Sequence, residues 1–468
     1  MKKKLLCLLG AAVMSFTAYG ADATTDVVVV GGGGAGLSAA IAAREKGANV
    51  ILLEKMLMLG GNTNYATAGI NAANTDLQKK LGIEDSAELF YNDTMKGGKN
   101  KNNPELVKKL TTDSSNIINW LTERGADLSE VVFTGGQSAK RTHRPAGGQA
   151  VGPVIVDALA ETAEKDGIDV RTESEVVKII KTGDKVTGVE VKHKGETYKI
   201  NAKAVVMATG GFGANAAMVA EYNSALKGFG STNSPAITGE GIKMVNSIGG
   251  ALVDMNEIQT HPTVVHNNTT MITEAVRGEG AILVNREGKR FINELETRDV
   301  VSKAELEQTG KSAFLIFDQS IRENLGAING YVKRGLAVEG ATLEELAKKM
   351  GINVNTLVKT METYNGYVKA GTDKDFGKTV LPRELVKAPF YAIEVSPAVH
   401  HTMGGVRINT KAQVLTADGK VIPGLYAAGE ITGGVHGANR IGGNAVTDIT
   451  VYGKTAGENA ADFAKTSK

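Results

Sequence analysis

The chain has 468 residues, of which 57 are glycine and one is cysteine (Cys7), and its formal net charge at pH 7 is +2. This length can hold two domains, or one large domain with an insertion. The near-neutral charge does not favour nucleic acid or acidic membranes as partners, and a lone cysteine excludes internal disulfides, cysteine-ligated metals and Cys-X-X-Cys-His haem attachment.

The first predicted element is a secretory signal at residues 1–23. A lysine-rich start precedes an apolar run from Leu5 to about Ala18, and small residues follow, with cleavage after Gly20 or Ala23. A bilayer span needs roughly 20 apolar residues, so an N-terminal membrane anchor is the weaker alternative. Removing the first twenty residues removes three lysines and no acid, which takes the formal charge from +2 to −1. We therefore expect a periplasmic protein without stable membrane insertion.

Residues 24–55 are predicted to form a strand, a glycine-rich loop, a helix and a second strand. The strands are expected at Asp26–Val30 and Asn49–Leu53, and the helix at about Leu37–Lys46. The loop matches Gly-X-Gly-X-X-Gly, which permits a tight turn, the approach of a pyrophosphate and close helix–strand packing. Glu54 closes the second strand, where its carboxylate can accept a hydrogen bond from a ribose hydroxyl. The motif glycines are Gly31, Gly33 and Gly36.

The second cofactor signal favours FAD over NAD. A further glycine-rich segment, GGNTNYATAGINAA, follows Lys55 and suits the extended reach of a flavin dinucleotide. A terminal helix is predicted from about Asn444, and its N-terminus could stabilise negative charge on a reduced flavin. The sequence contains no second complete fingerprint for NAD(P)H, and YGKT near the end is no P-loop because Asp448 stands where the motif needs glycine.

The remaining elements predict a nucleotide-binding domain split along the chain. KAVVMATGGFG and GLYAAGE each indicate a buried strand before a glycine turn, and NAVTDITVYGKTAGENAADFA indicates a terminal helix. Between them, ATLEELAKKMG predicts a helix with a capping box of Thr342 and Glu345 that ends at Gly351, and NVNTLVKTMETYNGYVKAG predicts one that ends at Gly371. GAILVNREGKRFINE predicts a strand, a tight turn and a strand.

The expected fold class is α/β: a Rossmann-like FAD-binding domain interrupted by an α+β capping domain. The two parts of the FAD-binding domain are placed at residues 24–255 and 397–468, and the capping domain at 256–396. A hinge is expected near Met255 and Pro397. The segments show no internal repeat, no low-complexity stretch and no flexible linker.

Five stretches resemble the flavoprotein domain of soluble flavocytochrome c fumarate reductases: QTHPT, ITEAVRGEGAILVNREGKRFINE, TRD, HHTMGGV and GGVHGANRIGGNA. The resemblance extends from about Thr24 to the end of the chain, and it is more distant to the flavoprotein subunits of succinate dehydrogenase and membrane fumarate reductase. It implies that the substrate lies between the FAD domain and a capping lobe. It also implies reduction of fumarate to succinate, with a hydride from flavin N5 to one alkene carbon and a proton to the other.

The resemblance also implies two carboxylate-binding pairs, as a dicarboxylate requires. His261 and Thr273 would bind one carboxylate, and His400 and Arg440 would bind the other. The family has a single substrate histidine before its Thr-Met-Gly-Gly run, which favours His400, so His401 is expected to be structural. The alternatives are structural roles: His261 as a buried core residue and Arg440 as a residue that caps a loop.

The proton donor implied by the resemblance is Arg298, supplied through Glu274 and Arg277, while Met271 packs near the alkene and helps to twist it. The ordinary pKa of arginine is above about 12, so the residue type alone would favour a carboxylate clamp with water or another group as donor. Glu274 and Arg277 are three residues apart and would face each other on a helical turn. A purely structural ion pair is the alternative.

The cofactor is expected to be non-covalent FAD, with no metal. The membrane fumarate reductases carry a histidine that bonds covalently to FAD, in the segment that corresponds to GGNTNYATAG of this chain, and this chain has no histidine there. The flavocytochromes carry haem motifs ahead of the flavin domain, and their absence here predicts a separate c-type cytochrome as electron donor. The expected cofactor-binding residues are Gly31, Gly33, Gly34, Ala35, Gly36, Glu54, Lys55, Asn62, Thr63, Ala68, Gly69, Thr209, Gly210, Gly239, Gly429, Glu430, Asn444, Ala445 and Val446.

The rival functions differ in how many carboxylates the site must hold. A sibling reductase of urocanate, acrylate, methacrylate or a cinnamate would need one pair fewer, and the family's urocanate reductases replace the histidine kept here as His261. Succinate oxidation is the same chemistry reversed, and non-covalent FAD favours the reductive direction. A flavin electron carrier without turnover should lack the Arg298–Glu274–Arg277 set, and an amine or L-aspartate oxidase is disfavoured by export.

Overall fold

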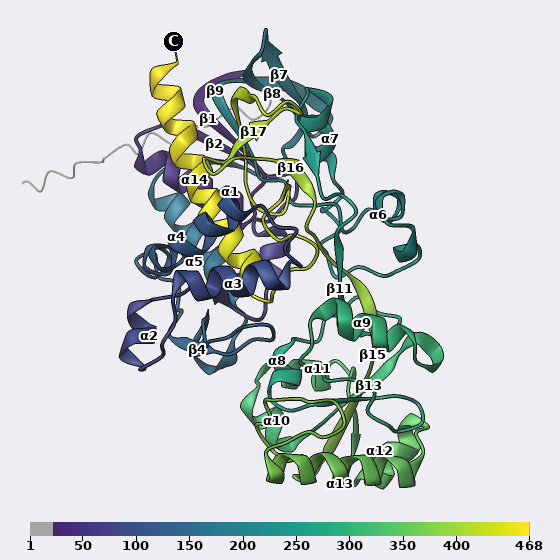
Figure 1. Cartoon of the computed structure of the whole chain (residues 1–468). Coiled ribbons are helices and arrows are strands. Elements are labelled where there is room, and N and C mark those ends of the chain that lie inside the picture. Colours follow the sequence, from purple (N-terminus) through teal and green to yellow (C-terminus); the bar gives the residue numbers. More distant parts are fainter. Residues whose placement is uncertain (1–21, 468) are drawn as a thin grey trace, which may run out of the picture.

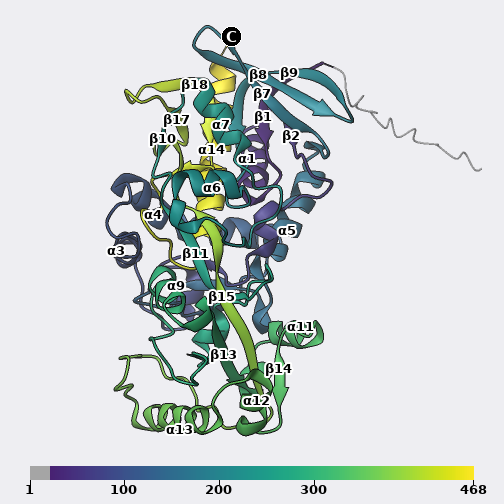
Figure 2. The ribbon, with the colours of Figure 1, turned by 90° about the vertical axis from the view of Figure 1, so that its right-hand side faces the viewer.

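The computed structural model describes residues 22–467, so the predicted leader lies outside the described residues except for its last two. The chain forms two lobes (Figure 1), with the C-terminal helix α14 (Asn444–Thr466) in the larger and α13 (Val354–Ala370) at the far end of the smaller. Two long strands, β11 (Ile258–Val265) and β15 (Phe390–Thr402), run side by side between the lobes (Figure 2). Within residues 22–467, no helix has the length and apolarity that a membrane crossing needs.

The larger lobe is organised around a mostly parallel sheet of eight strands. β1 pairs in parallel with β2 and β9, and β9 with β18, so segments from both ends of the chain meet in one sheet. Val27, Val28 and Val29 are fully buried, as expected where helices cover both faces of a sheet. The sheet strands are β1 (Ala23–Val30), β2 (Val50–Leu53), β6 (Asp169–Arg171), β7 (Glu175–Thr182), β8 (Lys185–His193), β9 (Glu196–Met207), β17 (Gln413–Leu415) and β18 (Val421–Ala427).

The closest helix pair of the larger lobe joins α1 (Gly34–Glu45) to α14. A Cβ atom at Gly457 would lie 2.1 Å from the carbonyl oxygen of Ala39, and one at Gly453 would lie 2.6 Å from that of Ala35. Only glycine allows the two backbones to approach this closely. This contact fixes the N-terminus of α14 beside the glycine-rich loop that begins α1.

The smaller lobe contains an antiparallel sheet in the order β11-β15-β13-β12, with β14 also paired to β15. A second hydrophobic core lies in this lobe and includes Leu283, Phe317 and Ile393. The helix α9 (Arg298–Leu306) packs where β11 and β15 leave the lobe (Figure 2). The other elements are β12 (Ile282–Val284), β13 (Ala313–Asp318), β14 (Val338–Gly340), α8 (Ala275–Gly278), α10 (Gln319–Asn324), α11 (Ala327–Lys333) and α12 (Leu343–Met350).

Shorter elements complete the larger lobe. Its other helices are α2 (Asp76–Lys80), α3 (Ala87–Gly97), α4 (Pro104–Thr122), α5 (Val151–Lys165), α6 (Ala216–Tyr222) and α7 (Glu240–Ser247). Its small sheets contain β3 (Ile70–Asn71), β4 (Glu130–Val132), β5 (Thr142–Arg144), β10 (Leu252–Val253), β16 (Gly405–Arg407) and β19 (Thr432–Gly433).

The predicted α/β class with an FAD-type domain and an inserted lobe is confirmed, and two local predictions are wrong. The second strand of GAILVNREGKRFINE does not form: beyond the turn only an isolated bridge links Val284 to Arg290. The capping box is incomplete, since the Glu345 carboxylate accepts from Ala341 N at 2.9 Å and not from Thr342 N. The domain limits at 255/256 and 396/397 stay predictions.

Candidate active site

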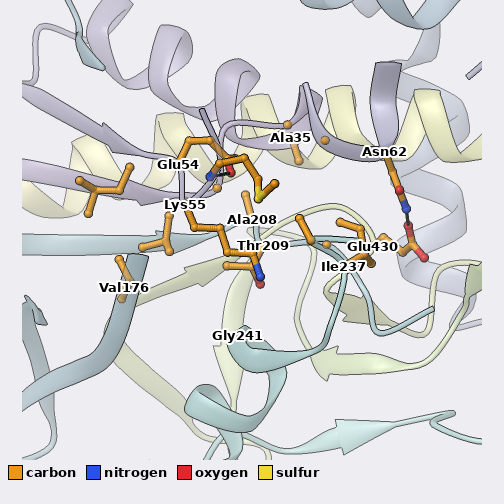
Figure 3. Close-up of a pocket in the computed structure, with 18 of the residues that line it drawn as sticks. Ala35, Glu54, Lys55, Asn62, Val176, Ala208, Thr209, Ile237, Gly241 and Glu430 are labelled. Atoms are coloured by element: carbon orange, nitrogen blue, oxygen red, sulfur yellow. Dashed lines mark hydrogen bonds between the residues drawn. The ribbon is translucent and has the colours of Figure 1, made fainter. Parts of the chain in front are cut away.

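A cavity of about 890 Å³ lies at the carboxyl ends of β1 and β2, beside the N-terminus of α1 (Figure 3). Glu54 lines it, and both of its carboxylate oxygens are fixed: Oε2 accepts from Gly32 N and Oε1 from Met56 N, each at 2.8 Å. The carboxylate is therefore held beside the glycine-rich loop at the predicted ribose position. Expected cofactor residues that line this cavity are Gly31, Gly33, Gly34, Ala35, Glu54, Lys55, Asn62, Thr63, Thr209, Gly210 and Glu430.

Each of the three motif positions is glycine for a different structural reason. Gly31 has φ +108°, and a Cβ atom there would lie 2.3 Å from the carbonyl oxygen of Ala208. A Cβ at Gly36 would lie 1.7 Å from the carbonyl oxygen of Gly31. At Gly33 a Cβ would meet no described protein atom closer than 3.6 Å. Packing thus requires the first and third glycines, whereas a Cβ at the second would make only ordinary van der Waals contacts. Gly33 lines the cavity, where the second glycine of the motif lets a phosphate approach the backbone.

A second cavity of about 750 Å³ continues from the first, because both are lined by Asn62, Thr63, Glu430 and Ile449. The Asn62 amide donates to Glu430 Oε2 at 3.3 Å where they meet (Figure 3). The joined cavities form an elongated groove from the predicted ribose carboxylate to the start of α14. The second cavity is also lined by the expected residues Ala68, Gly69, Met271, Arg298, His400, Arg440, Ala445 and Val446.

The groove fits an extended dinucleotide. Thr209 lines the first cavity, and its buried hydroxyl has no hydrogen-bond partner among the described residues. Buried polar groups are normally satisfied, so this oxygen is available to a ligand. Arg440 likewise has a buried, unpaired Nε within residues 22–467 at the other end of the groove. Polar groups for a nucleotide and for an anionic ligand are therefore both in place.

Four expected cofactor residues do not line either cavity: Gly36, Gly239, Gly429 and Asn444. Gly239 caps the N-terminus of α7 at φ +82°, and a Cβ at Gly429 would lie 2.8 Å from Cβ of Ala35. Asn444 is buried in a network with Asn71 and Thr94. Sequence reasoning missed lining residues that come from distant segments and carry no local signal. These include Met56, Ser174, Val176, Ala236, Ile237, Gly241 and Met244.

Two arginines converge at the wall of the second cavity. Arg298, the first residue of α9, donates to Glu274 Oε2 from Nη2 at 2.6 Å and from Nε at 3.1 Å. Its Nη1 donates to Gln259 Oε1 at 3.1 Å, and Arg440 Nη2 donates to the same oxygen at 3.1 Å. Gln259 was not predicted, although it is the first residue of the quoted motif QTHPT.

Glu274 connects Arg298 to a second, deeper arginine. Arg277 Nη2 lies 3.5 Å from Glu274 Oε1, as the predicted helical-turn pair requires, and Arg277 Nη1 donates to the carbonyl oxygen of Glu294 at 2.6 Å. Burial raises the pKa of Glu274, but the positive charges of Arg298 and Arg277 lower it more, so the pKa lies below its ordinary value. Glu274 is therefore an ionised bridge between two guanidinium groups.

The histidines occupy two depths. His400 lines the cavity and shares a hydrogen bond of 2.7 Å with the Thr232 hydroxyl, while His261 lies behind it, fully buried, with its ring centroid 5.1 Å away. Burial, followed by the charge of Arg298, lowers the pKa of both well below the ordinary value. Both rings are neutral, and His261 Nε2 has no hydrogen-bond partner in the described part of the chain.

The remaining predicted residues lie around this pair. Thr273 is buried and does not line the cavity, and its backbone N–H donates to the Tyr331 hydroxyl at 3.1 Å. His401 does line the cavity, and its ring contacts that of His436 at 5.3 Å. The structure thus brings His400, Arg440, Arg298 and Met271 to one surface but leaves His261 and Thr273 one layer behind it.

The electrostatics favour an anionic ligand. Three guanidinium groups, those of Arg298, Arg277 and Arg440, act on one ionised carboxylate, Glu274. Burial raises the pKa of Glu430, which also lines the cavity, so this carboxyl is less readily ionised. Burial, reinforced by the charge of Arg298, lowers the pKa of Arg440 to about 9. An entering carboxylate would offset that desolvation and raise the pKa again. Among residues 22–467 no group of three His, Cys, Asp or Glu side chains could hold a metal ion.

Comparisons with known proteins agree with this geometry. Residues 26–446 match the model of a family described as an FAD binding domain. A "Fumarate reductase (cytochrome)" of Shewanella frigidimarina is 52% identical over 446 residues, which cover 94% of this chain and 78% of that protein. A "Urocanate reductase" of Eggerthella lenta is 38% identical over 95% of this chain and 76% of its own length.

A solved structure shows the same fold. It is the open conformation of a flavocytochrome c3 fumarate reductase, which matches with a TM-score of 0.81 and 45% identity over 95% of this chain and 79% of that one. The family match, these relatives and the elongated groove together identify FAD as the cofactor. The chain is therefore a member of the FAD-binding oxidoreductase family to which the flavocytochrome fumarate reductases belong.

Proposed function

We propose that this protein reduces fumarate to succinate with FAD as its cofactor. The observation that carries the proposal is the position of Arg298, which is held by Glu274 and Gln259 at the wall of the cavity, beside Arg440 and His400. The guanidinium and imidazole groups of these residues supply hydrogen-bond donors at the end of the groove next to α14, which supports the binding of a small dianion there. Bound FAD would supply the hydride of the reaction.

The two carboxylates of fumarate would be bound by different layers of the site. His400 and Arg440 are at the cavity surface and would bind the first. His261 and Thr273 would bind the second carboxylate. His261 Nε2 has no hydrogen-bond partner among the described residues, so it is free to make this contact. Because both histidines are neutral, each can donate one ring N–H to a carboxylate without adding a buried charge. Met271, at the cavity surface, would pack on the alkene.

Arg298 would donate the proton. Guanidinium is a poor acid in water, since its pKa is above about 12. The neighbouring Glu274 is ionised, so it would first take up a proton and then return it to Arg298. The hydrogen bonds at 2.6 and 3.1 Å between these two side chains provide the contact for that return. Arg277 would supply Glu274 in turn.

A second candidate is the reduction of a monocarboxylate enoate such as urocanate, and the 38% identical urocanate reductase favours considering it. The acrylate, methacrylate and cinnamate types belong to the same class. Retention of His261 together with Thr273, His400 and Arg440 supports a dicarboxylate. The 52% identical relative named as a fumarate reductase supports the same choice.

The setting of the enzyme is also part of the proposal. The lysine-rich and apolar start of the sequence supports export to the periplasm by a cleaved signal peptide. The names of the relatives support a c-type cytochrome as electron donor. The segment from Gly61 to Gly69 contains no histidine, which supports non-covalent FAD.

The test is anaerobic oxidation of reduced methyl viologen by the purified holoprotein, with fumarate, urocanate, acrylate and methacrylate offered in parallel. We expect turnover with fumarate, and its loss in Arg298→Ala at unchanged FAD content. If only a monocarboxylate is turned over, that compound and not fumarate is the substrate, and one of the two carboxylate-binding pairs is wrongly assigned. The Arg286→Ala variant, which removes a more exposed arginine paired with Glu394, is the matched control.

A further inference from the structure

The relay from Arg298 through Glu274 ends at a side chain that solvent does not reach. Arg277 is fully buried, with 0% of its side chain exposed. Its Nη1 is occupied by the carbonyl oxygen of Glu294, while Nε and Nη2 have no hydrogen-bond partner among the described residues. A proton that leaves Arg298 at every turnover must be replaced from outside, so Arg277 needs a further donor.

One face of α9 provides such a donor. Its buried residues are Arg298, Val301, Ser302 and Glu305, so three of the four are polar or charged. Arg298, Ser302 and Glu305 are spaced i, i+4 and i+7, which places them in one row along the helix. The buried face of an ordinary amphipathic helix is apolar. The polar row therefore calls for a reason other than packing.

Glu305 is the end of this row. Its side chain is fully buried, and neither carboxyl oxygen has a hydrogen-bond partner in the described chain; the N–H of Ala313 approaches it, but with a geometry that falls short of a hydrogen bond. The Ser302 hydroxyl beside it is also buried and unpaired within residues 22–467. Native proteins satisfy such groups with protein atoms or ordered water.

The charge state of Glu305 follows from its surroundings. Burial raises the pKa of its carboxyl well above the ordinary value, and the positive charge of Arg277 on α8 offsets only part of that rise. Glu305 therefore keeps its proton to a higher pH than an ordinary glutamate does. The chain becomes exposed again at Glu307, Thr309 and Lys311, within two turns of it. Glu305 thus interacts electrostatically with the buried Arg277 and lies two residues before an exposed part of the chain.

The other acid near Arg277 cannot take this role. Glu294 is paired with Arg290 at 2.8 and 2.9 Å and with Lys378 at 3.2 Å. Burial raises its pKa, but Lys378 and Arg290 lower it further, to below the ordinary value. Glu294 is ionised and holds no proton to give.

We propose that Glu305 is the proton donor that reloads Arg277, through ordered water that also contacts the Ser302 hydroxyl. This rests on the fumarate reduction proposed above. In each turnover one proton leaves Arg298 for an alkene carbon, and Arg298 regains it from Arg277 by way of Glu274. Arg277 regains it from the Glu305 carboxylic acid, and solvent reprotonates the carboxylate that is left. One proton enters for each proton consumed, and the hydride comes from the reduced cofactor.

The test compares Glu305→Gln with Glu307→Gln, an exposed glutamate just beyond the end of the same helix. Glutamine keeps the volume of Glu305 but carries no acidic proton. We expect kcat with fumarate to fall at least about tenfold, with a larger solvent isotope effect, an unchanged KM and an unchanged rate of FAD reduction by dithionite. Glu307→Gln should match the wild type. A Glu305→Gln variant with the wild-type kcat would overturn the proposal.

The pH profile separates a proton donor from a structural role. Because the neutral acid is the donor, wild-type kcat should fall as pH rises through the raised pKa of Glu305. This decrease in kcat at high pH should be absent in Glu305→Gln. It should be present but shifted in pH in Glu305→Asp, whose shorter side chain still carries an acid. If Glu305→Gln does not fold, the aspartate variant decides: an unshifted decrease there would overturn the proposal.

The experiments distinguish a failure of the proposed function from a failure of the proposed role of Glu305. Wild-type protein that does not turn over fumarate would refute fumarate as substrate, whatever Glu305 does. Infrared difference spectra of the holoprotein without substrate then test the donor itself. A protonated-carboxyl band at pH 7 that is lost in Glu305→Gln supports it, and the absence of that band in the wild type overturns it.

Discussion

Arg298 and Arg440 donate hydrogen bonds to the same atom, the side-chain oxygen of Gln259, each at 3.1 Å. The amide nitrogen of Gln259 is itself fixed by Asn439 Oδ1 at 2.6 Å and by the carbonyl oxygen of Arg440 at 2.7 Å. One neutral, buried amide therefore sets the spacing of two cations that would otherwise repel each other. Neither guanidinium can turn without losing this shared acceptor.

Replacing Gln259 by leucine should lower kcat with fumarate by about 10- to 100-fold, because a hydrogen bond to a charged group contributes about 1.5–3 kcal/mol. The FAD content should not change, since Gln259 lines neither cavity. Steady-state kinetics with reduced viologen measures the effect. The exposed Gln149→Leu variant is the control. Wild-type kinetics in Gln259→Leu would show that the two arginines hold their positions without the amide.

Glu54→Gln should weaken FAD binding by about tenfold. Glutamine has one oxygen where Glu54 uses two to accept from Gly32 N and Met56 N, so one of these bonds is lost and a charged acceptor for the ribose with it. Fluorescence titration of the deflavinated protein with FAD measures the affinity. The exposed Glu161→Gln on α5 should bind as the wild type does. Equal affinities would move the ribose away from Glu54.

Two helical glycines should respond to alanine in opposite directions. At Gly457 the added Cβ would lie 2.1 Å from the carbonyl oxygen of Ala39, so α14 must shift from α1, at a loss of about 1–3 kcal/mol of unfolding free energy. At Gly366 in α13 it would meet no described atom within 4 Å, and alanine should add about 0.5–1 kcal/mol. Chemical denaturation measures both. Stabilisation by Gly457→Ala would contradict the close α1–α14 contact.

The buried histidines predict a loss of stability in mild acid. Burial lowers the pKa of His261, His400 and His401 well below about 6.5, their value in the unfolded chain. As pH falls below about 6.5 the unfolded state binds protons that the folded state does not, so each histidine removes up to about 1.4 kcal/mol of unfolding free energy per pH unit. Their contribution is fully present above pH 6.5.

Denaturation curves at pH 7.5, 6.5 and 5.5 measure this slope. His401→Asn should reduce the slope of the unfolding free energy against pH by about the contribution of one histidine, whatever the variant does to the stability at pH 7.5. An identical slope in the variant would show that His401 takes up its proton in the folded state as well.

Features that were predictable from the sequence are encoded within a few consecutive residues. The glycine-rich loop, the carboxylate of Glu54 and the terminal helix each need only a local pattern, and the structure contains all three. The missing strand after Arg290 shows the limit. That side chain pairs with Glu294 and with Asp373, which is 83 residues away, and no local pattern records the second partner.

The architecture of the site was predictable only in part. The residues around the second cavity follow from the family motifs, but Gln259 joins Arg440 across 181 residues and no spacing rule reveals such a bond. The depth of His261 behind His400 depends on the register of β11 against β15, which the sequence does not record. No local pattern in the sequence marks Glu305 as buried, because its burial depends on the packing of α9 against β11 and β15.

The two strands that join the lobes also carry the site. Gln259 on β11 is paired with His401 on β15, and His261 with Ala398, so the ladder that spans the lobes carries side chains of the candidate site. Arg298 starts a helix packed on the same pair of strands. A bend in this ladder would alter the distance from Arg298 to His400 directly, with no intervening loop to absorb it. The orientation of the smaller lobe and the positions of Arg298 and His400 are thus coupled through one pair of strands.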